Sequence, residues 1–528
     1  MELKKKVGRM LIAGFKGTTI SEEIKHLIHE YHIGGVILFG RNIGTPQEIL
    51  SLTRSLQLEA KAAGYSMPLL ICIDQENGVV RRLGDGTTII PGAMLLGAAG
   101  DVNYAMQAGR ITGKELKALG INWNLAPVVD VNNNALNPVI GVRSFGEDPK
   151  KVASLAVQTM TGMQEERVMT TLKHFPGHGD TSVDSHLDLP VIAHDLKRLH
   201  EVELVPFKEC IKTGADAIMT AHVYFPALET EENTPATLSK SVITGLLREK
   251  LGFDGVITTD CMEMDAIAKG IGTVEGALRA VEAGVDLVMV SHIHSLQEQS
   301  IIKIVEGVRN GVILEARIDE SVNRIDNMIG NYASWDEIEQ VSEVPAFVGS
   351  DSHRELMREI YKAGITKVYG NGEAIAHEAK VLLIYPTNEY ATMVEDRRYS
   401  TIGMADELMK VHKNVEILEI IPADYAVAIE GAVEKSTGYD HVVVLTLNAV
   451  KDPAQERLVH KLIESGKPVD VIAIRSPYDA ALFQNANRVI CTYEFTKSAF
   501  EIVSEFLVGK VEVKGKLPVS LPFIETIF

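Results

Sequence analysis

The amino-acid sequence predicts an α/β protein, a (β/α)8 TIM-like barrel followed by a smaller α/β sandwich domain. Short apolar runs alternate with amphipathic stretches up to about residue 340, eight such runs occur, and a second alternating series begins near residue 376. The chain of 528 residues is too long for one ordinary core, because single domains usually hold about 100–200 residues. We therefore expect a barrel over 1–340, a helical linker over 341–375 and the sandwich domain over 376–528.

The eight apolar runs are the candidate strands of the barrel. Their alternation with amphipathic stretches is typical of parallel strands joined by helices. Eight strand-helix units in roughly 300 residues is the size of a (β/α)8 barrel. The runs are MLIAGF (10–15), GGVILF (34–39), PLLICI (68–73), INWNLAPVVDV (121–131), VMTTLKHF (168–175), DAIMTAHV (216–223), GVITTD (255–260) and DLVMVS (286–291).

Two of the helices between these runs carry clear start signals. Thr45-Pro46-Gln47-Glu48 is a capping box with proline at the first helical position, and Asp148-Pro149 repeats the device. The Thr or Asp side chain accepts a hydrogen bond from a free backbone N–H, and proline has no N–H to leave unpaired there. We therefore expect helices to begin at both places.

The second alternating series predicts the smaller domain. The helical stretch DSHRELMREIYKAGI leads into it, and AKVLLIYP (379–386) is its first expected strand. HVVVLTL (441–447) and VDVIAIR (469–475) are further strands, while AQERLVHKLIESG and SAFEIVSEFLVG are helices. No GxGxxG follows a strand, so nucleotide binding is not indicated.

Charge and hydropathy exclude several partners. The formal net charge is −19 and no Lys/Arg-rich run offsets it, so we expect binding neither to nucleic acid nor to an anionic membrane surface. No segment approaches the roughly 18 apolar residues that span a bilayer, and the apolar run MLIAGF is too short for an export signal. The sequence does not indicate an oligomeric state.

Cysteine usage predicts a cytoplasmic protein. The four cysteines, Cys72, Cys210, Cys261 and Cys491, show no CxxC spacing. Scattered cysteines of this kind are usually reduced thiols, and a zinc site built on cysteine is not expected. We expect no cofactor and no bound metal.

Polar residues stand where nearly every predicted barrel strand ends. In a (β/α)8 barrel the active site lies at this edge of the strands. Each residue alone has a structural alternative, because an Asp or His after a strand often caps a helix or binds loop amides. The candidates are Asp74, Asn124, Asp130, Lys173, His174, His222, Asp260 and His292.

The densest group of candidates is the stretch KHFPGHGDTSVDSH, residues 173–186. Its glycines and proline favour a shaped loop over the mouth of the barrel rather than a helix. Asp184 and His186 are two residues apart and can form a hydrogen bond. An aspartate that accepts a ring N–H fixes the histidine tautomer and leaves the other nitrogen for proton transfer. For His178 and His222 we favour loop packing or secondary roles.

Asp260 is the candidate nucleophile. It ends the run FDGVITTD, which is otherwise apolar and therefore expected to be buried on both faces. A carboxylate at the end of such a strand is held rigidly in the barrel mouth, which suits nucleophilic catalysis. Glu263 and Asp265 lie close by, so the chemistry alone leaves the assignment ambiguous.

Several motifs resemble glycoside hydrolase family 3, specifically its β-N-acetylglucosaminidase branch. The resemblance covers nearly the whole chain, and the KHFPGHG element is its most specific part. The motifs are IDQENGVVRRL (73–83), NLAPVVDV (124–131), RSFGEDP (143–149), KHFPGHGDTSVDSHLDLP (173–190), PATLS (235–239), GFDGVITTDCMEMDAI (252–267) and GKLPVSLP (515–522).

The resemblance implies a retaining exo-β-N-acetylglucosaminidase that releases N-acetylglucosamine from small oligosaccharides such as chitooligosaccharides or cell-wall fragments. It places Asp260 on the family's nucleophile, and Asp184 with His186 on the acid/base pair that separates this branch from the β-glucosidases. The β-glucosidases use a glutamate from the second domain instead. Residues that match positions holding the sugar hydroxyls and acetamido group are Asp74, Arg82, Arg143, Lys173 and His174.

One departure from the family pattern and three alternative interpretations of the function stay open at this point. Asn77 stands where relatives usually carry glycine, which puts the loop shape beside Asp74 in question. A phosphorylase would use the same residues with inorganic phosphate in place of water. A metal-dependent barrel hydrolase is a remoter interpretation, based on the pair His292 and His294, because the first strand supplies no matching histidines. A non-catalytic barrel would tolerate loss of the Asp and His candidates, and all are present.

Overall fold

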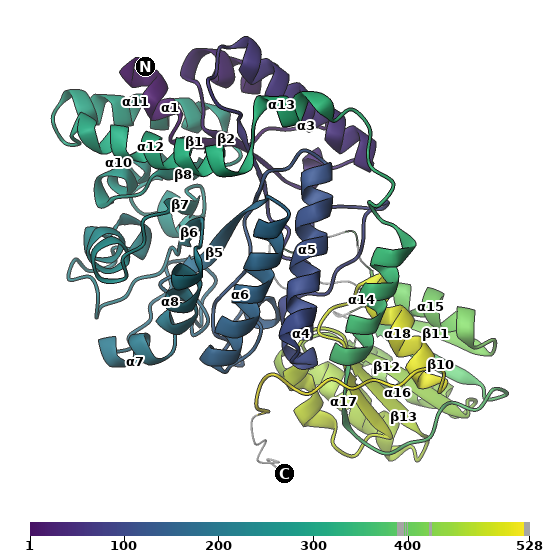
Figure 1. The fold of residues 1–528 in the computed structure, drawn as a ribbon. Coiled ribbons are helices and arrows are strands. Elements are labelled where there is room, and N and C mark those ends of the chain that lie inside the picture. The colour runs from purple at the N-terminus through teal and green to yellow at the C-terminus, as the bar shows by residue number, and fades with distance from the viewer. Residues whose placement is uncertain (388–394, 396–397, 399, 422–424, 522–528) are drawn as a thin grey trace.

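The computed structural model of the chain describes residues 1–387, 395, 398, 400–421 and 425–521. It consists of a closed eight-stranded barrel and a separate six-stranded sheet with helices on both faces (Figure 1). The predicted fold class is confirmed. Pro522, the last residue of the GKLPVSLP motif, lies outside the described residues.

All eight predicted barrel strands are confirmed, and they are parallel and follow one another in chain order. The barrel closes where β1 pairs with β8, with Leu11 opposite Val288. The strands are β1 (Leu11–Ala13), β2 (Gly35–Leu38), β3 (Leu70–Ile73), β4 (Trp123–Asn124), β5 (Met169–Phe175), β6 (Ala217–Thr220), β7 (Val256–Cys261) and β8 (Leu287–Val290).

The fourth strand is much shorter than the predicted run over 121–131. Only Trp123 and Asn124 pair with β3 and β5, and a single bridge joins Val128 to Lys173 further on. Pro127 has no backbone N–H to donate to a neighbouring strand, so the ladder stops before it. The apolar residues beyond it are buried in a loop that leads to Asp130.

Helices surround the barrel and two of them begin as predicted. Thr45 and Glu48 form the capping box of α3, and Asp148 accepts hydrogen bonds from Lys150 N and Lys151 N at the start of α6. The α-helices of this part are α1 (Leu3–Gly8), α2 (Glu22–His26), α3 (Pro46–Ala62), α4 (Ala93–Ala99), α5 (Val102–Ala118), α6 (Pro149–Glu165), α7 (Leu196–Glu201), α8 (Leu204–Thr213), α9 (Asp265–Ala268), α10 (Thr273–Ala283), α11 (His294–Arg309), α12 (Glu315–Tyr332) and α13 (Trp335–Gln340). Leu27–Tyr31 and Ser241–Lys250 are π-helical turns.

The second sheet has the strand order β11-β10-β12-β13-β14-β9, with β9 antiparallel to its neighbour. Helix α15 packs with α18, and α16 with α17, which gives the expected sandwich. The elements are α14 (Asp351–Gly364), β9 (Thr366–Tyr369), β10 (Val381–Pro386), α15 (Gly403–Val411), β11 (Val415–Ile420), α16 (Tyr425–Ser436), β12 (His441–Thr446), α17 (Pro453–Glu464), β13 (Val469–Ala473), β14 (Arg488–Cys491) and α18 (Lys497–Leu507).

Three strands of this sheet are absent from the sequence prediction. β9 and β14 hold four residues each, and β11 lies at the edge of the sheet with its charged residues exposed. Because β9 lies inside the stretch expected as a helical linker, we propose that the linker ends with α14. For the barrel we still propose the limits 1–340, while the expected end of the C-terminal domain, residues 522–528, lies outside the described residues.

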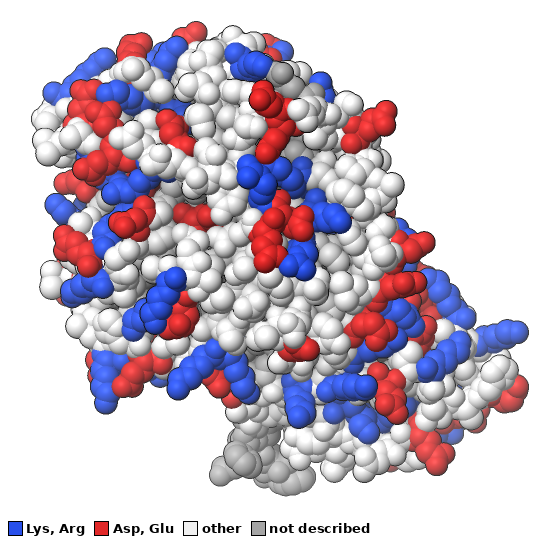
Figure 2. Space-filling view, in the orientation of Figure 1, with Lys and Arg blue, Asp and Glu red and all other residues white. Residues whose placement is uncertain are grey.

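The distribution of charged side chains on the surface and the character of the helices bear on the partners that the sequence was expected to exclude. Figure 2 shows acidic and basic side chains interspersed over the face drawn, with no basic patch on that face. Among the described residues, no helix combines the length and the apolar character that crossing a membrane requires.

Candidate active site

A cavity of about 470 Å³ opens at the carboxyl ends of the barrel strands. Among the described residues, all those that line it fall between positions 37 and 292, so they belong to the barrel. Of the predicted site residues, the cavity brings together Asp74, Arg82, Arg143, Lys173, His174, His186 and Asp260. Asp184 lies directly behind His186 and is hydrogen-bonded to it.

The remaining strand-end candidates have other surroundings. The Asn124 side chain bonds both the N–H and the carbonyl of Gln75, so it shapes the loop after β3. Both ring nitrogens of His222 have partners, Thr237 Oγ1 at 2.8 Å and the Cys261 carbonyl at 3.0 Å. This agrees with the secondary role expected for His222. His292 lines the cavity, with its Nδ1 atom 3.0 Å from Arg41 Nη1.

Asp260 stands at the end of β7 and faces the cavity. Its Oδ1 atom accepts a hydrogen bond of 2.7 Å from Cys261 N. Burial on its own raises the pKa of this carboxyl, but the nearby histidines, His222 foremost, outweigh burial and hold the pKa below its usual range. The carboxylate is therefore ionised at neutral pH, as a nucleophile must be.

Asp184 and His186 form the expected pair. Asp184 Oδ1 accepts hydrogen bonds from His186 Nδ1 at 2.7 Å and from His186 N at 2.9 Å. Burial raises the pKa of Asp184, but the hydrogen bond and charge of His186 lower it further, so the net shift is downward. Because Nδ1 is engaged by a carboxylate, Nε2 is the nitrogen left for proton transfer in the cavity.

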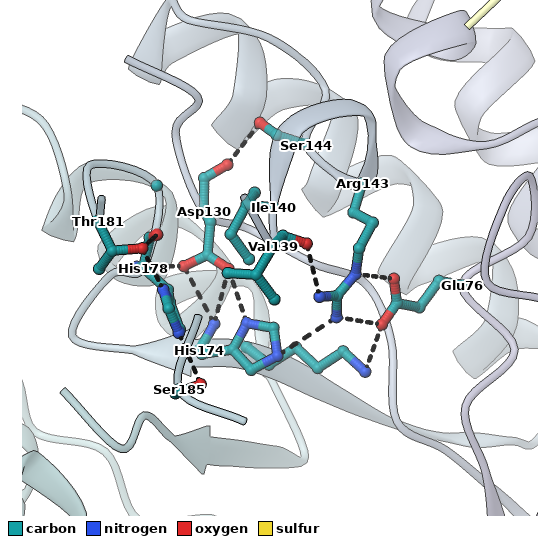
Figure 3. A network of polar contacts seen from close by, with 12 residues as sticks. Glu76, Asp130, Val139, Ile140, Arg143, Ser144, His174, His178, Thr181 and Ser185 are labelled. Carbon is teal, nitrogen blue, oxygen red and sulfur yellow. Dashed lines mark hydrogen bonds and ion pairs between the residues drawn. The ribbon is translucent and has the colours of Figure 1, made fainter. Parts of the chain in front are cut away.

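A second Asp–His pair lies deeper in the barrel. Asp130 is fully buried, and its Oδ2 atom lies 2.7 Å from His174 Nδ1. Its carboxylate also accepts hydrogen bonds from the backbone N–H groups of His174 and His178 (Figure 3). Burial raises the pKa of Asp130, but the charges and hydrogen bonds of His174 and His178 together hold the pKa below its usual range. Asp130 thus fixes the ring of His174 without lining the cavity itself.

Glu76 lines the cavity as well, and the sequence prediction missed it. Its carboxylate receives two hydrogen bonds from Arg143, Nε at 2.8 Å and Nη2 at 2.7 Å (Figure 3). Lys173 Nζ lies 2.6 Å from the same carboxylate and 2.8 Å from Asp74 Oδ1. The pattern Asp-x-Glu directly after a strand could have pointed to Glu76, but attention to strand ends selected Asp74 alone.

The Glu76 network determines what Arg143 and Lys173 can do. Arg143 also donates to the Val139 carbonyl at 3.1 Å, so its guanidinium is largely committed to the protein. Burial raises the pKa of Glu76, but the charges of Arg143 and Lys173 hold the pKa well below its usual range. The two cations are therefore pinned at fixed positions beside the cavity.

Replacing Glu76 with glutamine should lower the free energy of unfolding by about 3 kcal/mol at neutral pH, because it leaves buried cations without their charged partner. Because the folded-state pKa of Glu76 is depressed, its contribution is complete above the ordinary value of 4.5. It is lost as the pH falls from there toward the folded-state pKa. Urea unfolding at pH 7 and at pH 3 measures the effect, which should shrink at pH 3.

A matched control for this prediction is Glu165→Gln, which breaks an exposed pair with Arg110. Exposed pairs contribute only about 0–1 kcal/mol, so this variant should unfold almost like the wild type at both pH values. Equal destabilisation by the two substitutions would show that the Glu76 network does not stabilise the fold.

Asn77 keeps the loop beside Asp74 in shape. Its φ angle is +72°, in the left-handed region that glycine adopts most easily and asparagine tolerates. The side chain is held by Thr112 Oγ1 and by Gln75 Nε2, each at 3.0 Å. Asparagine therefore adopts the conformation that a glycine would take there, and its side chain anchors the loop.

The second domain contacts the loops that carry cavity residues. Arg398 Nη2 donates to the carbonyls of Arg81, Arg82 and Leu83 at 3.1, 2.7 and 3.1 Å. Glu494 accepts from Gly92 N at 2.8 Å. These contacts brace the loop after β3, in which Arg82 lies.

A closed barrel whose cavity holds an ionised carboxylate and an Asp–His pair has the groups that a glycoside hydrolase uses, and comparison with known proteins places the chain in that class of enzyme. The chain belongs to glycosyl hydrolase family 3, because the model of the family's N-terminal domain matches residues 2–328. It is 32% identical to beta-hexosaminidase A of Pseudoalteromonas piscicida over 96% of this chain and 92% of that protein. It is also 37% identical to a beta-hexosaminidase of Xylella fastidiosa over 54% of this chain and 83% of that protein.

Among solved structures, a family 3 β-N-acetylglucosaminidase from Paenibacillus sp. strain FPU-7 superposes with a TM-score of 0.93 and 40% identity, covering 99% of each chain. The resemblance noted in the sequence is thus confirmed at the level of the family and of its β-N-acetylglucosaminidase branch.

Proposed function

We propose that the protein is a retaining exo-β-N-acetylglucosaminidase that releases N-acetylglucosamine from the non-reducing end of small glycans. The observation that carries the proposal is that Asp260 and His186, with Asp184 bonded behind it, meet in one cavity whose described lining residues all belong to the barrel. The names of the relatives, beta-hexosaminidase and β-N-acetylglucosaminidase, support the same activity.

The mechanism follows from the roles proposed for these groups. The Asp260 carboxylate attacks the anomeric carbon while His186 Nε2–H gives its proton to the departing oxygen, so one bond to carbon forms as the other breaks. Neutral His186 then takes a proton from water, which attacks the same carbon and releases Asp260. Two inversions at one carbon retain the configuration. Asp184 keeps the imidazole oriented and stabilises its protonated form.

The polar residues around the nucleophile are proposed to hold the sugar. Asp74 and Lys173 are linked by a hydrogen bond of 2.8 Å and both line the cavity. His174 is oriented by Asp130, its Nε2 atom lies 3.5 Å from Arg143 Nη2, and Arg82 also lines the cavity. Since Glu76 already binds Arg143, we propose that Arg143 acts on the substrate partly by positioning Glu76 and His174.

The test is hydrolysis of p-nitrophenyl β-N-acetylglucosaminide and of the matching β-glucoside. We expect the acetamido sugar to be cleaved with a kcat/KM at least about 10²-fold higher, since a site that binds a polar substituent rejects the analogue that lacks it. NMR of the first-formed sugar should show the β-anomer. Equal rates on both glycosides, or release of the α-anomer, would contradict the proposal.

Two further arms of this assay address the alternatives. Inorganic phosphate should leave the product as N-acetylglucosamine, whereas a phosphorylase would produce N-acetylglucosamine 1-phosphate. Chelators should leave the rate unchanged. Cys261, Glu263 and His292 do hold ligand-type atoms within 4.8 Å of one another. The Glu263 carboxylate, however, already accepts hydrogen bonds from the backbone N–H groups of Ser291, His292 and Ile293.

We also propose that the enzyme acts in the cytoplasm as part of carbohydrate metabolism. Its four cysteines are all free, and Cys72, Cys210 and Cys491 are buried, as suits a reducing compartment. Cell fractionation with an antibody against the protein would test the location.

A further inference from the structure

The loop that carries the acid/base pair has little apolar packing to hold it. Asp184–Asp188 is a turn in which Leu187 N and Asp188 N both donate to the Asp184 carbonyl. The apolar side chains Val183, Leu187 and Val191 are 38%, 63% and 49% exposed. The position of His186 over the cavity must therefore depend on polar contacts between this turn and the barrel.

Ser185, between the two members of the pair, makes such a contact. Its side chain is buried, and its Oγ atom lies 3.0 Å from Nε2 of His178 (Figure 3). Its carbonyl also accepts a hydrogen bond of 3.4 Å from Ala266 N, in the segment that follows the nucleophile strand. His178 is buried at the start of the same loop, where it lines the cavity.

The surroundings of His178 determine its tautomer. The Thr181 hydroxyl donates to the His178 carbonyl at 3.1 Å, so its oxygen is the acceptor for His178 Nδ1–H at 2.9 Å. Nε2 then carries the lone pair, and the Ser185 hydroxyl donates to it. Burial and the neighbouring His174 lower the pKa of His178 to about 4, which keeps the ring neutral and Nε2 able to accept.

His178 is itself fixed to the deepest carboxylate of the site. Its backbone N–H donates to Asp130 Oδ1 at 2.7 Å, and the other oxygen of Asp130 holds the ring of His174. One buried carboxylate thus orients a cavity residue on one side and, through His178 and Ser185, the turn of Asp184 and His186 on the other.

We propose that His178 is a positioning residue for catalysis, whose hydrogen bond from Ser185 sets the place of the Asp184–His186 pair over the cavity. The inference rests on the proposed function, in which His186 is the acid/base. His178 transfers no proton in this scheme. It acts only by keeping His186 Nε2 within reach of the oxygen that leaves.

Two substitutions of His178 separate its two hydrogen bonds. Asparagine places an amide near Nδ1 and can still donate to Thr181, but it cannot reach Ser185. Glutamine reaches the place of Nε2, where its amide oxygen can accept from Ser185. We expect His178→Asn and Ser185→Ala each to lower kcat by about 10²-fold on a phenyl β-N-acetylglucosaminide, the loss typical of a catalytic group misplaced by about 1 Å. His178→Gln should recover most of that activity.

A positioning role and a merely structural role differ in how the loss of activity depends on the leaving group of the substrate. Phenolate is a poor leaving group without a proton, whereas p-nitrophenolate leaves readily unprotonated. His178→Asn and Ser185→Ala should therefore lose much less activity on the p-nitrophenyl substrate than on the phenyl substrate. Azide, which needs no general base, should raise their turnover and yield the β-glycosyl azide.

The double variant His178→Asn with Ser185→Ala should be no less active than either single variant, because both substitutions break the same contact. His412→Asn is the matched control, a buried histidine with one bond to the Ala379 carbonyl in the second domain, and it should show neither effect.

The outcomes are distinguishable with His186→Ala measured alongside. In the first outcome, His186→Ala shows the leaving-group dependence and the azide effect, but His178→Asn and Ser185→Ala do not, because they lose activity equally on both substrates or lose none. The positioning role is then wrong, and the proposed function stands. If His186→Ala itself shows neither effect, the acid/base assignment fails and the positioning role falls with it.

Discussion

Replacing Asp260 with asparagine should lower kcat/KM for p-nitrophenyl β-N-acetylglucosaminide by about 10⁴-fold or more, the scale seen when an attacking group is removed. The amide cannot form the glycosyl ester, and β7 carries no second carboxylate at its end to replace it. Steady-state kinetics at pH 7 measures the loss. The fold should be unaffected, since the oxygen of the introduced amide can still accept a hydrogen bond from Cys261 N.

Asp265→Asn and Glu263→Gln are the controls, because these are the other carboxylates close to the nucleophile in the sequence. Asp265 lines the cavity but is paired with Lys269 at 2.8 Å, so Asp265→Asn should stay within about threefold of wild type, the size of a minor perturbation near 0.6 kcal/mol. Glu263 holds the start of the segment after β8, so Glu263→Gln should act on stability first. Full activity of Asp260→Asn would rule out Asp260 as the nucleophile.

Azide can identify the role of Asp260 by stereochemistry. With Asp260→Ala, azide can enter the space of the missing carboxylate and displace the leaving group in one step, giving the α-glycosyl azide. A variant that lacks only the acid/base should give the β-azide, because attack on the glycosyl-enzyme inverts the carbon a second time. Formation of the β-azide by Asp260→Ala would contradict the nucleophile assignment.

Replacing His186 with alanine should lower kcat by about 10³-fold on a phenyl glycoside, within the range that general acid–base catalysis supplies. On p-nitrophenyl glycoside the loss should be smaller, because that leaving group departs without a proton. Asp184→Asn should weaken the same step by removing the negative charge that favours the protonated imidazole. Its kcat on the phenyl glycoside should therefore stay below that of the wild type across the pH–rate profile.

The downward shift of the Asp184 pKa explains why Asp184→Asn is expected to lose activity. The carboxyl pKa is held below its ordinary value by the His186 hydrogen bond, in spite of burial, so Asp184 is ionised across the working range. Its charge is therefore present in the wild type and absent in Asp184→Asn at every pH of the profile. An unchanged kcat of Asp184→Asn on the phenyl glycoside would show that the two residues do not act as a unit.

Much of the fold could be predicted from local patterns. The eight parallel strands of the barrel are visible in the sequence as eight apolar runs, because both faces of each strand are buried. The capping residues of α3 and α6 act within one helical turn, so their effect is visible in four consecutive letters. The strands at 366–369, 415–420 and 488–491 were missed because short strands and edge strands lack a long apolar run.

The sequence by itself also determined the chemistry available to the site. Asp260 at a strand end, the spacing of Asp184 and His186, and the motifs that carry the family resemblance are all present in the letters. In a barrel the carboxyl ends of all strands lie at one face. The sequence could therefore predict that most of the site residues meet in one cavity, although it gives no distances between them.

Only the tertiary structure decided how these groups are held. Glu76 binds Arg143 and Lys173, which lie 67 and 97 positions along the chain (143 − 76 and 173 − 76). Asp130 reaches His174 and His178, and His178 reaches Ser185, through contacts that depend on where loops fold back. Hydrogen bonds of about 3 Å require positions accurate to fractions of an ångström, and such positions arise from packing between distant segments, which no local pattern in the sequence specifies.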